Sequence, residues 1–255
     1  MAFPITVQLG YGQEKTESSS QKLKLGTRAE TPDGRVFYYA QNSSAAISTA
    51  GMIVDGSALV AAHDMDVPPT EAQAAGSTTV SLEVPTTDLT KNQYKDGYLV
   101  FNDEAGEGEV YRIREHPAHD ASDDATCVFT LDEIDGLRTA ITTDTEAQLV
   151  YNPYTAVKLL DGDGTQTTGP LGVTTIPVTA SYYTWIQTAG IASVSIGAQV
   201  GVIGDGLTVS QQSGESGQAE RTDYSDEADL ANIGVAIGVA SVSGDKQLAM
   251  LNIRP

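Results

Sequence analysis

Apolar and polar side chains alternate along several short stretches of this chain, with the two-residue period of a β-strand. The clearest stretch is residues 79–84, where Val80, Leu82 and Val84 share one face and polar side chains share the other. The same interpretation applies to four neighbouring stretches: residues 98–101, 109–115, 127–131 and 147–151. Strands this short and closely spaced predict a small antiparallel barrel or sandwich in the middle of the chain.

The rest of the chain also has the pattern of β-structure. Residues 23–30 and 35–40 flank a turn-forming sequence at residues 31–34, which predicts a β-hairpin. Two consecutive prolines are followed by residues 70–76, which end in glycine and predict a helix of one or two turns at a domain boundary. After residue 155, glycines separate β-branched strands, and only residues 224–232 have a helical pattern.

Together these patterns predict a mainly β protein with two or three small antiparallel barrel or sandwich domains and an extended N-terminal segment. The predicted division is an N-terminal arm and hairpin region at residues 1–76, an acidic antiparallel domain at 77–155, and a glycine-rich barrel at 156–255.

Small residues alternate with larger apolar ones close to the C-terminus. Gly234, Ala236 and Gly238 predict that neighbouring backbones approach closely in a tightly closed barrel. The alternating Val235 and Ile237 are then expected to be buried.

The first 30 residues differ from the rest in charge, because four Lys and Arg residues face three Glu residues in a chain whose formal charge is -20. Four apolar residues alternate with other residues at the start of this segment: Phe3, Ile5, Val7 and Leu9. The polar stretch 13–21 that follows predicts a flexible joint. The strand either folds back onto its own sheet or reaches a neighbouring molecule, and the sequence favours neither. In the second case the contact residues are these four and three cations: Lys22, Lys24 and Arg28.

The charge balance also bears on the partners. With 14 Lys and Arg against 34 Asp and Glu, most of the surface repels nucleic acid and anionic membranes, so neither is an expected partner. No secretory signal and no stretch of about 18 apolar residues is found, so we expect synthesis in a cytoplasm. The single cysteine, Cys127, lies in a strand-like stretch and is expected to be a small buried side chain.

Candidate chemistry is sparse. His116 and His119 lie near several aspartates, Asp120, Asp123 and Asp124, but their spacing does not match a structural zinc site, and a solvated acidic loop is the favoured interpretation. Residues 161–164 resemble part of a calcium loop without its glutamate, so they predict a turn. No nucleophile, base and orienting group stand together, so we expect no catalytic residues, no cofactor and no metal site.

An aromatic stretch at residues 182–186 contains the only tryptophan. By alternation Tyr183 and Trp185 share one face of a strand, which makes them candidates for the core or for contact with another subunit. The core is the favoured interpretation of the two, and a platform for carbohydrate is the third.

The C-terminal quarter resembles a known family of structural proteins. The segments that carry the resemblance are residues 191–202, 206–209 and 233–240, the turn Gly244-Asp245, and residues 248–253. They are similar to the head decoration, or capsid cement, proteins of tailed bacteriophages, whose domains end in a Gly-Val-Ala-rich strand, a Gly-Asp turn and a last strand. The resemblance covers residues 191–255 and leaves the first two thirds of the chain unexplained.

This resemblance implies an accessory virion protein, often trimeric, on the outside of an assembled capsid, with no catalytic residues. We therefore expect a structural protein rather than an enzyme, which binds the major capsid protein and itself as a homotrimer, and which resides on the capsid surface after synthesis in the host cytoplasm. The alternative is a head-fibre or adhesin module that binds glycans through Trp185 and exposed tyrosines, and a hydrolase is the third possibility.

Overall fold

The computed structural model describes residues 6–84, 87–122, 126–161, 166–222, 231–240 and 242–254. These residues form β-strands, loops and one 3₁₀ turn, η1 (Gln13–Lys15), and contain no α-helix, so the mainly β class is confirmed. None of the described elements is a helix of the length and apolarity needed to cross a bilayer. The predicted helix at 224–232 lies mostly outside the described residues.

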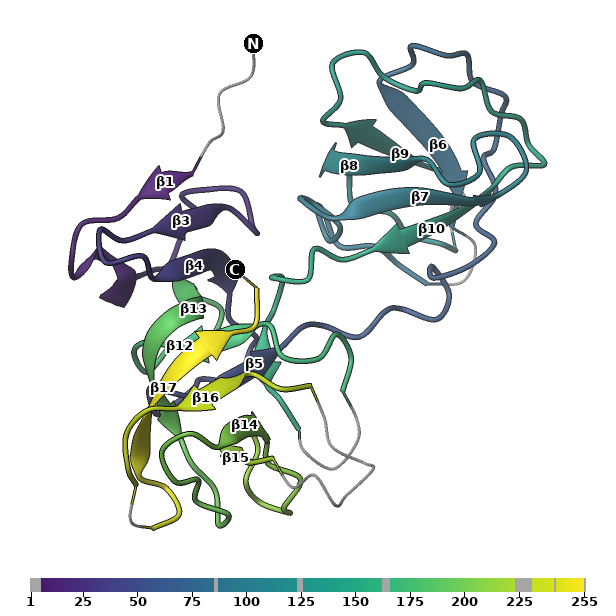
Figure 1. Cartoon of the computed structure of the whole chain (residues 1–255). Helices are drawn as coiled ribbons and strands as arrows, with labels where there is room; N and C mark the ends of the chain where they lie inside the picture. Colours follow the sequence, from purple (N-terminus) through teal and green to yellow (C-terminus); the bar gives the residue numbers. More distant parts are fainter. Residues whose placement is uncertain are drawn as a thin grey trace. The chain divides into compact units, whose positions relative to one another are not determined.

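The chain divides into two compact units (Figure 1). Unit 1 combines Met1–Ser57 with Pro153–Pro255, and unit 2 is the continuous segment Ala58–Asn152. This division does not follow the predicted boundaries, because strands within the first 57 residues pair with strands that follow residue 152, so both segments belong to one unit.

Unit 2 is a five-stranded antiparallel sheet with the order β10-β7-β8-β9-β6. Its strands are β6 (Thr79–Glu83), β7 (Tyr98–Asp103), β8 (Val110–Glu115), β9 (Thr126–Leu131) and β10 (Glu146–Val150). All five strands occur where alternation predicted them. Val80, Leu82 and Val84 are fully buried in one core, which confirms the predicted inward face.

The short helix predicted at residues 70–76 is wrong. Pro69 forms a bridge to Leu82, and Gln73 forms a bridge to Ile141, so this segment is extended. The amide groups of such a segment bond to neighbouring strands instead of to their own next turn, and these tertiary contacts outweigh the local helical preference.

Unit 1 is built on a twelve-stranded sheet whose main path is β1-β3-β4-β13-β17-β16-β14-β15. The path strands are β1 (Val7–Gln8), β3 (Arg28–Glu30), β4 (Val36–Gln41), β13 (Tyr183–Ser195), β17 (Lys246–Asn252), β16 (Gly234–Ala236), β14 (Gly206–Val209) and β15 (Ala219–Arg221). Four strands lie off this path: β2 (Glu17–Ser18), β5 (Ile53–Asp55), β11 (Lys158–Leu159) and β12 (Gly172–Thr174). The long β13 is central, since it pairs with β4, β17, β12 and β2.

The hairpin predicted at residues 23–40 is confirmed, with β3 and β4 joined through a turn that ends at Gly34. Gly34 has a φ of +79°, a conformation that glycine adopts at little cost. The predicted barrels, in contrast, are not found. Among the described residues neither sheet closes, because the strands at the ends of each path do not pair with each other.

Small side chains determine the packing of β16. A Cβ atom on Gly234 would lie 2.2 Å from the carbonyl oxygen of Met250, so only glycine allows β16 and β17 to approach this closely. Ala236 is buried while Val235 faces outward, so the predicted burial of Val235 is wrong and the small residues form the inner face. Ile237 is half-buried.

Candidate functional site

The N-terminal residues with predicted contact roles belong to the sheet of unit 1 wherever they are described. Val7 pairs in parallel with Ala29 on β3, and Leu9 is buried in the core. Phe3 and Ile5 lie outside the described residues. For Val7 and Leu9 the structure thus favours the first alternative, a strand that folds back onto its own sheet.

The predicted flexible joint at residues 13–21 is wrong, because this segment is tied to the sheet. Ser18 pairs with Tyr183 on β13, and the carboxylate of Glu17 accepts hydrogen bonds from the amide and hydroxyl of Thr179 at 2.8 and 2.7 Å. A serine-rich composition predicted mobility, but these long-range hydrogen bonds fix the segment.

The three N-terminal cations lie before and on β3. Lys22 and Lys24 are exposed, and Arg28 forms an ion pair with Glu30 on the same strand at 3.4 Å. Both side chains of that pair are partly exposed, so it contributes little to stability.

Trp185 packs in the core of its own chain. Its side chain is 6% exposed, and its ring meets that of Tyr39 edge-on at 5.1 Å, while Tyr183 stacks on Tyr39 at 6.0 Å. The core interpretation therefore holds for Trp185. A glycan platform or a subunit contact on this residue needs an exposed ring, which the structure does not provide.

The histidines are buried in unit 2 and are not part of a solvated loop. The amide of Tyr94 donates to Nε2 of His116 at 3.0 Å, and Nδ1–H of His116 donates to the carbonyl oxygen of Pro117 at 2.8 Å. These partners require the neutral ring, and burial lowers the pKa of His116 in the same direction. Asp123 and Asp124, and residues 162–164 of the predicted turn, lie outside the described residues.

Cys127 is buried, and burial raises the pKa of its thiol to about 11, which keeps it in the unreactive thiol form. Within the described ranges no group of three His, Cys, Asp or Glu side chains could hold a metal ion.

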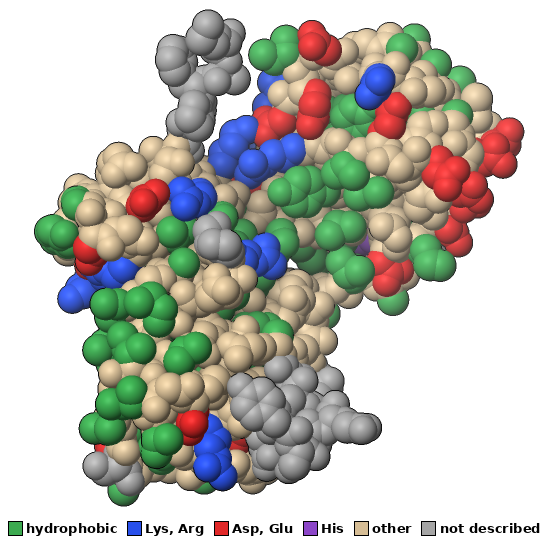
Figure 2. All heavy atoms as spheres, in the orientation of Figure 1, with side chains coloured by type: hydrophobic (Ala, Val, Ile, Leu, Met, Phe, Trp, Pro, Cys, Tyr) green, Lys and Arg blue, Asp and Glu red, His purple; other side chains and the backbone are tan. Residues whose placement is uncertain are grey.

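The exposed feature that stands out is an apolar face on the sheet of unit 1. Register places Met250 on β17 between Ile191 on β13 and Val235 on β16, and Leu248 lies two residues along β17 on the same side. These four side chains are 41–49% exposed, and we call them the apolar face. Figure 2 shows hydrophobic side chains gathered where β17 lies in Figure 1.

A cavity of about 250 Å³ adjoins the apolar face in unit 1, and we call it the cationic pocket. Apolar atoms of Val173, Ile191 and Leu248 line part of it. Three cations from distant parts of the sequence line the rest: Lys15, Arg35 and Lys246. Positive charge is thus concentrated beside apolar side chains in a strongly acidic chain.

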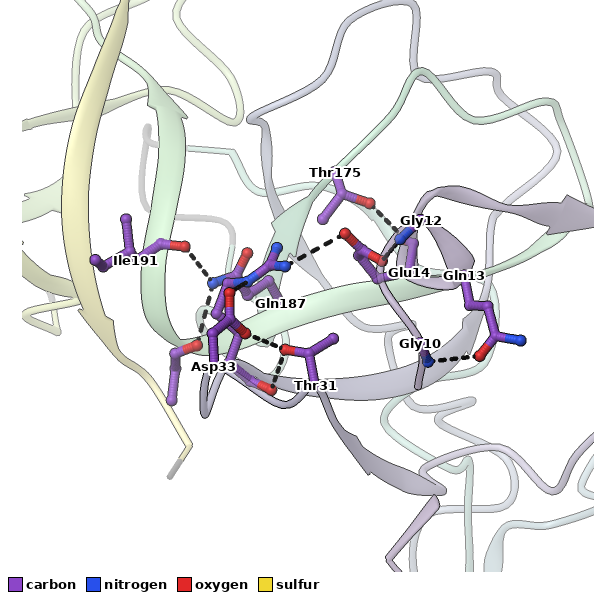
Figure 3. Close-up of polar contacts among 11 residues, drawn as sticks. Gly10, Gly12, Gln13, Glu14, Thr31, Asp33, Thr175, Gln187 and Ile191 are labelled. Atoms are coloured by element: carbon purple, nitrogen blue, oxygen red, sulfur yellow. Dashed lines mark hydrogen bonds and ion pairs between the residues drawn. The ribbon is translucent and has the colours of Figure 1, made fainter. Parts of the chain in front are cut away.

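Arg35 is held in a fixed position at this pocket. Its guanidinium pairs with Asp33 at 2.8 Å and with the buried Glu14 at 3.4 Å, and Glu14 also accepts from the amide of Gly12 at 2.6 Å. Figure 3 shows Glu14 and Gln187 converging on this region from η1 and β13. The stem of Arg35 lies against Gly190, where a Cβ atom would lie 3.0 Å from Cγ of Arg35.

Lys246 is placed in a similar way. A Cβ atom on Gly51 would lie 3.3 Å from Cδ of Lys246, so glycine leaves room for the stem of the lysine. Burial lowers the pKa of Lys246. Neither Lys246 nor Lys15 forms an ion pair with another residue in the part of the chain that the structure describes.

This arrangement suits the binding of a group that is both anionic and apolar. Two lysines without an acidic partner among the described residues, one of them partly desolvated, attract a carboxylate, and the adjoining apolar walls accept an aliphatic group. Sequence reasoning missed the site because its cations are far apart along the chain and meet only through the pairing of β4, β13 and β17. Comparison with known proteins adds no further assignment, since no family model, curated protein or solved structure matches the chain.

Proposed function

We propose that the chain is a structural protein that assembles as a homo-oligomer, a trimer in the simplest case, and decorates the outside of a viral capsid by contact with the major capsid protein. The observation that carries the proposal is the apolar face. It lies within residues 191–255, the segment that resembles the decoration proteins of tailed bacteriophages.

The physical argument concerns the cost of leaving this face in water. Apolar side chains scattered singly on a surface need no explanation, but a contiguous group on three adjacent strands is typical of a contact site. Burial of such side chains provides about 25 cal/mol for each Å² removed from water, which can offset charge repulsion between molecules as acidic as these.

The proposal is tested by electron microscopy of capsids from the virus that encodes the chain, with and without added protein. We expect extra density on the outer surface, and co-sedimentation that Met250→Asp weakens by about tenfold or more. Val110→Asp is the matched control, because Val110 is also an exposed valine on a strand but lies in unit 2. Capsids that bind no protein, together with binding to a glycan array, support the adhesin alternative and overturn the proposal.

A further inference from the structure

The loop that follows β9 in unit 2 presents a single aliphatic side chain between acids. Ile134 is 93% exposed, which is the highest value among the large hydrophobic residues described, and its neighbours are Glu133 and Asp135. Asp135 is also exposed. Single exposed apolar side chains are common on protein surfaces, but this one is flanked by carboxylates, a combination that a pocket with apolar walls and cations would accept.

This loop is a fixed turn. Oε1 of Glu133 accepts from the amide of Arg112 at 2.9 Å, and the amide of the buried Leu137 donates to the carbonyl of Ser77 at 2.8 Å. Gly136, with a φ of +65°, lies where a Cβ atom would be 2.4 Å from that same carbonyl oxygen. The tip is therefore presented in one conformation, which lowers the entropic cost of docking it.

The cationic pocket of unit 1 is complementary to this tip. It combines apolar walls with the ammonium groups of Lys15 and Lys246, whereas the tip combines an aliphatic side chain with the carboxylate of Asp135. At about 250 Å³ the cavity is smaller than the ~300–1,000 Å³ of typical small-molecule sites, and it suits a single side chain.

Charge favours the same pairing over longer distances. Unit 2 carries 19 Asp and Glu residues against 5 Lys and Arg residues, so its surface is strongly acidic and complements a cluster of cations. Complementary charges of this kind increase association rates and select the partner.

We propose that Ile134 of one copy inserts into the cationic pocket of a second copy, with the carboxylate of Asp135 facing the lysines of that pocket. The contact is heterologous, since the pocket lies in unit 1 and the tip in unit 2, and heterologous contacts form rings such as trimers when the rotation between successive copies closes. The inference rests on the proposed homo-oligomer and identifies the contact that holds it together.

Sedimentation velocity over a range of concentrations tests this. We expect the unmodified chain to associate and Ile134→Ser to raise the dissociation constant by about tenfold or more, which corresponds to the loss of one buried aliphatic side chain. Val128→Ser is the matched control, because Val128 is an exposed aliphatic residue of unit 2 outside the loop. Thermal melting should be unchanged in both variants, since neither side chain is in the core.

Exchanging the charges tests the proposed interaction between Asp135 and the lysines of the pocket. Asp135→Lys and Lys246→Asp should each weaken association, and the double variant should restore it at least in part. Added salt should weaken association of the unmodified chain, because the lysines and Asp135 are exposed.

The outcomes separate this inference from the proposed function. If the unmodified chain associates but Ile134→Ser and the charge variants leave the dissociation constant unchanged, the Ile134 contact is overturned and the homo-oligomer stands. If the unmodified chain stays monomeric at all concentrations, the homo-oligomer and this contact are both overturned.

Discussion

Asp55 offers the sharpest test of how unit 1 is held together. Its side chain is fully buried at the end of β5, and no cation neutralises it within the described residues. Instead, Oδ1 accepts from the amides of Gly56 and Thr168 and from the hydroxyl of Thr168, and Oδ2 accepts from the amide of Thr167, each at 2.8 Å. Burial alone would raise the pKa of Asp55, but these hydrogen bonds outweigh it and hold the pKa below its ordinary value.

The expected cost of Asp55→Asn follows from this geometry. The amide oxygen can replace Oδ1, but the NH₂ group then faces the amide of Thr167, so one charge-assisted hydrogen bond is lost and a buried donor is left without an acceptor. Each of these terms costs about 1–3 kcal/mol, and together we expect a loss of about 3 kcal/mol. For a unit of this size that lowers the melting temperature by roughly 6–12 °C.

Differential scanning calorimetry at neutral pH measures this shift, with Asp33→Asn as a control because Asp33 is an exposed, hydrogen-bonded carboxylate of the same unit. The sign of the pH dependence is also fixed. A carboxyl whose pKa is lowered by folding stabilises the protein above its unfolded pKa of about 3.9, and this stabilisation is lost as the pH falls through the folded value. The difference in melting temperature between the unmodified chain and Asp55→Asn should therefore become smaller below about pH 4. An Asp55→Asn variant that melts within about 2 °C of the unmodified chain at pH 7 refutes the reasoning.

Three further predictions concern other buried groups. Because burial lowers the pKa of His116 below 6.5, unit 2 should lose stability as the pH falls below that value. His116→Gln should flatten this part of the plot of melting temperature against pH, and an unchanged plot contradicts the prediction. Cys127, whose pKa is raised to about 11, should react with a thiol reagent at pH 8 only after denaturant unfolds unit 2, and rapid labelling of the folded chain contradicts this. Gly234→Ala should destabilise unit 1 by about 2 kcal/mol or more in urea unfolding, because the added methyl group would collide with a backbone oxygen. Gly10→Ala is the control and should change the free energy of unfolding far less, because a Cβ atom there makes only ordinary contacts.

Strands were predictable from the sequence where one face is buried and the other is exposed to solvent. The alternation at residues 79–84 gave both the strand and its inner face, since Val80, Leu82 and Val84 are larger and more apolar than their neighbours. The same rule failed on β16, where backbone contact with β17 requires the small residues to face inward. Alternation reports that two faces differ, but the identity of the buried face depends on the distance to the next strand.

The candidate site was less predictable than the strands. Arg35 and Lys246 are separated by most of the chain, and no local pattern indicates that β13 brings them to one pocket. The exposure of Ile134 was likewise hidden, because an isoleucine between two acids in the sequence looks no different from an isoleucine at the edge of a core. Both features depend on the three-dimensional fold, which brings distant strands together at the pocket and leaves the loop after β9 on the surface.

The insertion of unit 2 into unit 1 sets an order of events during synthesis. The buried strand β5 leaves the ribosome before unit 2, but its partners β11 and β12 come after it. The 95 residues of unit 2 lie between them and take roughly 5–20 s to translate at 5–20 residues per second. Unit 2 is complete within that interval, while β5 still lacks both partners. The N-terminal segment is therefore the part of the nascent chain that most needs protection from wrong pairing, and slow translation after residue 152 would prolong that exposure.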